Sequence, residues 1–252
     1  MFDVLIPTLV TSAGIVDNIG MYSYGSASFA FLILAIFASI SRRKNPVGDA
    51  LLTACILTAV WAAIIATSTL LARPTLLLIQ LAEAARNSAW IFVLLRLLSL
   101  QAQGANHFVT TNRWVRWYFL SFILIIVLLV STGPVIQKFP SLFDILLYAN
   151  SGSWLGMSIV SLLLLHRYYF NSDDRELWTT KQLCFGLGLV FSFDFFMYTE
   201  GLLFRQLDYN VWQSRGFVST LAAILIGIGI TGTASKQIEE NKQGFRTPRH
   251  LA

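Results

Sequence analysis

The chain has 252 residues, of which 56% are hydrophobic and only 12% are charged, and its mean hydropathy is +0.65. A soluble domain would carry about a quarter charged residues, so the composition excludes that class and indicates a membrane protein. The excess of 18 basic over 13 acidic residues does not indicate nucleic-acid binding, because the basic residues lie in short loops between apolar runs, as topology signals do.

Seven runs are long and apolar enough to cross a bilayer as helices, which takes about 20 residues. They cover residues 20–40, 49–71, 75–100, 117–137, 142–165, 180–203 and 211–233. The runs are continuous and do not alternate, which argues against a transmembrane barrel. We therefore expect an all-α polytopic membrane protein: a bundle of seven transmembrane helices over residues 20–233, an extracytoplasmic N-terminal segment, 1–19, and a polar tail, 234–252, that is disordered.

Lys and Arg are distributed unequally between the two sides of this predicted bundle. Twelve lie in the first, third and fifth loops and in the tail, whereas three lie in the loops on the opposite side and three lie within spans. Cytoplasmic loops are the ones enriched in Lys and Arg. We therefore place the N-terminus outside the cytoplasm and the C-terminus inside. No Lys or Arg precedes the first span, so we expect no cleavable signal peptide.

The sequence offers no catalytic, metal or cofactor site. It contains no Gly-rich phosphate loop and no HExxH pattern, and no two of its three histidines have metal-ligand spacing. Cys55 and Cys184 lie in apolar runs without a CxxC partner, which favours buried thiols that act as small apolar fillers. No span interior contains a lysine that could bind retinal, which argues against a rhodopsin-type pigment.

Charged side chains inside the spans are costly in a bilayer, so they are functional candidates by default. In the third span, Glu83, Arg86 and Asn87 are three and four residues apart, which places them on one helix face. Their position within the span places them in its outer half.

In the sixth span, Asp194, Tyr198 and Arg205 share one face, whereas Glu200 lies on another side; Arg215 lies near the start of the seventh span. The candidate polar cluster therefore comprises Glu83, Arg86, Asn87, Asp194, Tyr198, Glu200, Arg205 and Arg215. Its six charges sum to zero, and all lie in the outer half of the bundle in the orientation given above.

Two interpretations of this set remain open at the level of sequence. It can be an ion-pair network that locks the third, sixth and seventh helices together, with Glu200 and Arg205 reaching the headgroup region. It can also be a polar pocket, open to the outer side, that recognises a ligand or a lipid headgroup. Asp194 lies deepest, among phenylalanines, and its partner is expected to be Arg86, Arg215 or a ligand.

A long segment of the sequence resembles a known family. The stretch KQLCFGLGLVFSFDFFMYTEGLLFRQLDYNVWQSRGFVSTL, Lys181 to Leu221, is similar to the membrane region of PrsK, the sensor histidine kinases of bacterial PEP-CTERM/exosortase systems. The family pattern has an FLCLGLG run, then an Asp and a Tyr in one helix, then LLFRR.D...W..RG. The matching positions here are Leu183 to Gly188, Asp194, Tyr198, Leu202 to Arg205, Asp208, Trp212, Arg215 and Gly216.

The resemblance extends over most of the seven predicted helices. The segment ARNSAWIFVLLRLL is similar to the family's LRDAAW...LLRLL, with Asn87 where the family has Asp, a departure that weakens an acidic role at this position. PrsK proteins continue into a GAF-like region and a kinase core, neither of which this sequence contains. We therefore expect that the chain cannot phosphorylate anything alone and is a truncated product, a fragment or a stand-alone relative of the sensor half.

The resemblance implies a sensory module in a bacterial inner (cytoplasmic) membrane that acts with a kinase domain or a kinase protein in trans. In the intact system it would sense an envelope signal and steer exopolysaccharide and PEP-CTERM protein expression. The lipid bilayer is a further expected partner, and the possibility of a homodimer is left open. No nucleic acid, metal or cofactor is expected. The alternatives are a small transporter or channel subunit, which would use the charges as a permeation relay, and a structural membrane partner protein.

Overall fold

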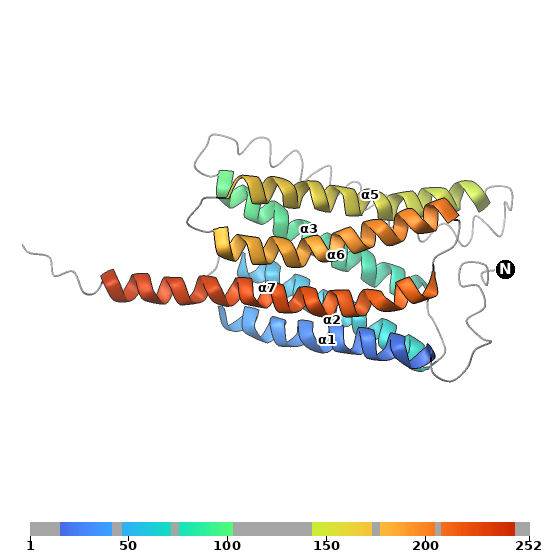
Figure 1. The fold of residues 1–252 in the computed structure, drawn as a ribbon, viewed down its shortest axis with the longest axis horizontal. Coiled ribbons are helices and arrows are strands. Elements are labelled where there is room, and N and C mark those ends of the chain that lie inside the picture. The colour runs from blue at the N-terminus through green and yellow to red at the C-terminus, as the bar shows by residue number, and fades with distance from the viewer. Residues whose placement is uncertain are drawn as a thin grey trace, which may run out of the picture.

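The computed structural model describes residues 16–41, 47–71, 76–102, 143–172, 177–204 and 208–244, and these ranges form a bundle of long helices (Figure 1). With the labels of Figure 1, the helices are α1 (Val16–Ser41), α2 (Gly48–Leu70), α3 (Leu76–Ala102), α5 (Phe143–Phe170), α6 (Leu177–Phe204) and α7 (Tyr209–Gly244). All six are long and apolar enough to cross a membrane. The chain is therefore an all-α, multi-pass membrane protein.

Six of the seven predicted spans are confirmed. The predicted and observed helix ends agree to within a few residues, except at the end of the last helix. The predicted span at 117–137 lies outside the described residues, so a seventh helix stays a prediction. The same holds for the orientation of the termini, because the structure contains no membrane that would fix it.

The last helix is longer than the sequence analysis predicts. The expected disordered tail begins at residue 234, but α7 continues as helix to Gly244. The expectation was therefore wrong for residues 234–244. The physical reason lies in the composition of this stretch: Ala, Lys, Gln and Glu are favourable helix formers, and neither Gly nor Pro occurs between residues 233 and 244. As a result α7 extends well past the end of the bundle (Figure 1).

The helices surround a common interior. Among the described helices, each packs mainly against two others, in the order α1, α2, α3, α5, α6, α7 and back to α1. α1 and α2 are antiparallel, because Tyr24 contacts Trp61 while Ser28, later in α1, donates to the carbonyl of the earlier Ala59. α1 and α7 are parallel, because Ser23 donates to the carbonyl of Gln213 while Ser26 bonds the later Thr220. Near their C-terminal ends α3 and α5 lie side by side, where Gln101 donates to Ser172 at 3.0 Å.

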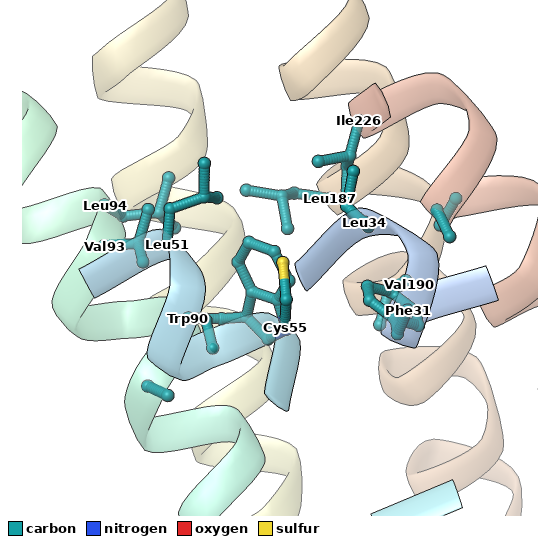
Figure 2. Close-up of a cluster of buried hydrophobic side chains, with 14 of the residues drawn as sticks. Phe31, Leu34, Leu51, Cys55, Trp90, Val93, Leu94, Leu187, Val190 and Ile226 are labelled. Atoms are coloured by element: carbon teal, nitrogen blue, oxygen red, sulfur yellow. The ribbon is translucent and has the colours of Figure 1, made fainter. Parts of the chain in front are cut away.

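An apolar core fills one half of the interior (Figure 2). Side chains from all six helices meet there, among them Phe31, Leu34, Leu51, Cys55, Trp90, Leu94, Leu187, Val190 and Ile226. Cys55 and Cys184 are buried, unbridged members of this core, as predicted. Large apolar side chains also cover the outside; Phe29, for example, is 66% exposed, as expected of a lipid-facing surface.

α7 approaches its two neighbours closely at glycines. A Cβ atom at Gly216 would overlap the backbone of Ser23 on α1, and one at Gly186 of α6 would lie 2.9 Å from the carbonyl oxygen of Ala222. Small residues at such crossings let helix backbones come together in a membrane. The two contacts fix the position of α7 between α1 and α6.

Candidate functional site

Six polar side chains from three helices converge inside the bundle, in the half opposite the apolar core. We call them the polar cluster: Glu83, Arg86 and Asn87 of α3, Asp194 and Tyr198 of α6, and Arg215 of α7. Each helix presents them because residues three or four apart share a face. All six were predicted from sequence, and the structure brings them into one hydrogen-bonded network.

Asp194 is the centre of this network. Its Oδ2 accepts a hydrogen bond from Arg86 Nη2 at 2.6 Å, and its Oδ1 accepts one from Arg215 Nε at 2.7 Å. Asp194 and both arginines are only 1% exposed. The sequence left the partner of Asp194 open between Arg86, Arg215 and a ligand; in the structure both arginines bind it. One carboxylate therefore joins α3 and α7 to α6.

Glu83 makes the second link between these helices. Its Oε1 accepts hydrogen bonds from Arg215 Nη2 at 2.5 Å and from the Tyr198 hydroxyl. Asn87 holds the remaining arginine in place, because its Oδ1 accepts from Arg86 Nε at 3.1 Å and from Arg86 Nη2 at 2.8 Å. Asn87 therefore acts as a neutral acceptor that orients a guanidinium.

The charges of the polar cluster balance. Two carboxylates, Glu83 and Asp194, face two guanidiniums, Arg86 and Arg215. Removing a charge from water is expensive, and a buried ion costs several kcal/mol or more unless it is paired and hydrogen-bonded. Pairing of every charge is what allows the cluster to persist in an apolar bundle. The side chain of Glu83 is the most accessible of the four, at 8% exposed against 1% for the others.

Two aromatic residues that the sequence analysis did not select complete the site. Trp61 of α2 is fully buried, and its ring lies 4.1 Å from the Arg86 guanidinium carbon and 5.0 Å from that of Arg215. Tyr24 of α1 packs edge-on against Trp61, with ring centroids 5.5 Å apart, and its hydroxyl donates to the carbonyl of Trp212. Cations over an indole face are electrostatically stabilised. The sequence signal was a tryptophan in the interior of a span, away from both interfaces.

Two predicted site residues do not join the polar cluster. Glu200 lies on a different face of α6, as the helical spacing predicts, and no described residue pairs with its buried Oε2 atom. Arg205 lies outside the described residues. The observed cluster is therefore smaller than the predicted set, and it is neutral without these two residues.

The polar cluster sits toward the end of the bundle where α3 and α7 begin and α6 ends. At 1.5 Å per residue, Arg86 is about 15 Å from the start of α3, Asp194 about 15 Å from the end of α6, and Arg215 about 9 Å from the start of α7. Further along the same helices, Trp90, Leu187 and their neighbours form the apolar core. The polar cluster and this apolar core thus lie at different levels along the bundle axis, and smaller apolar clusters flank the polar cluster.

No protein-family model, curated protein or solved structure matches this chain. The structure alone therefore defines the class of protein: a multi-pass helical membrane protein with a buried, charge-balanced network that links three of its helices.

Proposed function

We propose that the chain is a membrane-embedded signal-sensing module. The observation that carries the proposal is the arrangement of the polar cluster, because Asp194 and Glu83 together join α3, α6 and α7 through charged hydrogen bonds. Most other arrangements of these helices would leave buried polar groups without hydrogen-bond partners. A change at one member of the network therefore alters the packing of all three helices. Ionisable groups inside a membrane are by default sites of function.

Signal transmission in this proposal proceeds through α7. This helix carries Arg215 in the polar cluster at one end and continues past the bundle at the other, to Gly244. A ligand that binds one arrangement of α6 and α7 relative to α3 more tightly than another shifts the population toward that arrangement. The projecting part of α7 would carry the displacement out of the membrane.

The resemblance to the sensor half of the PrsK family supports the same proposal and adds the cellular setting. By this resemblance the protein would act in a bacterial inner membrane. The distribution of Lys and Arg would put the N-terminus outside and the polar cluster in the outer half. The output would come from a kinase domain or a kinase protein in trans. The regulated processes would be exopolysaccharide and PEP-CTERM protein expression.

The proposal can be tested in a full-length PrsK relative with the same cluster. Neutral replacements equivalent to Asp194→Asn and Arg215→Gln should abolish signalling to the response regulator while membrane insertion persists. The matched control is the equivalent of Arg96→Gln, because Arg96 lies on α3 but is exposed. Unchanged signalling in both cluster variants would refute the sensing role. For this chain itself, co-purification of a soluble histidine kinase would separate a split sensor from a purely structural membrane protein.

A transporter or channel subunit remains the alternative from another functional class. A permeation relay needs polar groups along the whole path through the membrane. Beyond the polar cluster, however, the described part of the interior holds the apolar core. Measurement of proton and solute flux in liposomes containing the purified chain tests this alternative; flux above that of empty liposomes would favour it.

A further inference from the structure

The polar cluster has more hydrogen-bond donors than the described residues can satisfy. Arg86 and Arg215 both use Nε and Nη2, and in both the Nη1 atom is buried and has no acceptor among the described residues. The indole Nε1 of Trp61 is also buried and has no acceptor in that part of the chain. All three side chains are at most 1% exposed.

The three side chains that carry these donors are in contact with one another. Both guanidiniums lie over the indole of Trp61, at 4.1 and 5.0 Å from its centre. The aromatic face can partly satisfy the N–H groups that point at it, but the indole N–H lies in the ring plane and receives nothing from that face. An unsatisfied buried donor costs about 1–3 kcal/mol, and more when it is charged. Three such donors on side chains that contact one another are the basis for inferring a binding site for an acceptor.

The charge balance decides which acceptor fits. Glu83 and Asp194 already neutralise Arg86 and Arg215, so an anion would add an unbalanced charge inside an apolar bundle. An uncharged oxygen accepts from the same donors without that cost. We propose that Arg86, Arg215 and Trp61 form an internal binding site for a small uncharged oxygen acceptor: a carbonyl or hydroxyl group, with water as its smallest member.

The inference rests on the proposed function in one respect: if the polar cluster senses a ligand, this site defines the chemical class of that ligand. The site itself can be tested without any signalling assay. Failure of binding and failure of the sensing role are therefore distinguishable.

The test uses the full chain in phosphatidylcholine nanodiscs, with its seven tryptophans labelled with ¹⁵N. Trp61→Phe assigns the indole signal of Trp61 and keeps an aromatic ring under the cations. Trp90→Phe assigns the control, because Trp90 is equally buried but its Nε1 donates to Thr58 at 2.9 Å. The first readout is the nuclear Overhauser effect from water to each indole proton. The second is the change in indole chemical shift on titration with acetamide or with sodium acetate, the latter compared with sodium gluconate.

Acetamide and acetate have nearly the same shape and differ in charge, so the pair separates a neutral site from an anion site. We expect a water or acetamide contact at the Trp61 indole and none at Trp90, with no acetate-specific shift. Absence of both contacts at Trp61 would overturn the proposal. So would a saturable response to acetate that acetamide does not produce, because it would assign the site to an anion. Unchanged signalling in the cluster variants, with binding at Trp61 intact, would count against the proposed function alone.

Discussion

Replacement of Asp194 by Asn tests the energetic role of the polar cluster. The amide keeps the shape of the side chain but removes the charge that Arg86 and Arg215 share at 2.6 and 2.7 Å. Among the described residues, Glu83 would then be the one carboxylate left to face two buried guanidiniums. Removing one partner of a buried pair costs about 3–5 kcal/mol, and we expect the upper end of this range because two arginines lose the same partner.

The measurement is reversible unfolding of the purified chain in mixed micelles of increasing sodium dodecyl sulfate content. Arg96→Gln on α3 is the matched control. Arg96 is exposed and its guanidinium lies over the Phe92 ring, so this change should alter the free energy of unfolding by less than about 1 kcal/mol. The double variant Asp194→Asn with Arg86→Gln restores neutrality, so it should lose less than the sum of the two single variants, by about 1–3 kcal/mol. A loss below about 1 kcal/mol for Asp194→Asn, or strict additivity, would show that Asp194 does not stabilise the two arginines together.

Three further substitutions probe the surroundings of this carboxylate in the same assay. Glu83→Gln should destabilise less than Asp194→Asn, because the Glu83 side chain is 8% exposed and holds one arginine; an equal or larger loss would contradict this ranking. Tyr198→Phe should lose about 1.5–3 kcal/mol, the range for a hydrogen bond to a charged group, and no loss would show that its bond to Glu83 contributes nothing. Gly216→Ala should cost about 1–3 kcal/mol through overlap with α1, whereas Gly152→Ala, with open space at Cβ, should be neutral or stabilising. Equal effects of the two alanines would argue against the close crossing.

Much of the fold can be predicted from sequence because the bilayer imposes a simple rule. A run of about 20 apolar residues has to satisfy its backbone internally and therefore forms a helix. The end of the last helix could not be found in this way. Residues 234–244 are polar, so hydropathy does not detect them, and their helical structure follows from local propensity and continuity with α7.

The residues of the polar cluster could be predicted from sequence, but the hydrogen bonds between them could not. Helical spacing placed Glu83 with Arg86, and Asp194 with Tyr198, on shared faces. It could not show that Asp194 binds two arginines at once, because that depends on which helices are neighbours in the bundle. Trp61 was missed for the same reason: only the packing of α2 brings its ring beneath the two guanidiniums.

If the polar cluster sets the position of α7 relative to α3, the distance between these two helices depends on Asp194. Spin labels at Arg96→Cys on α3 and Ile228→Cys on α7, both exposed positions, report this distance by pulsed electron paramagnetic resonance in a background without Cys55 and Cys184. We predict one narrow distance distribution for the labelled chain and a shifted or second population when Asp194→Asn is added. Identical distributions with and without that substitution would contradict the account.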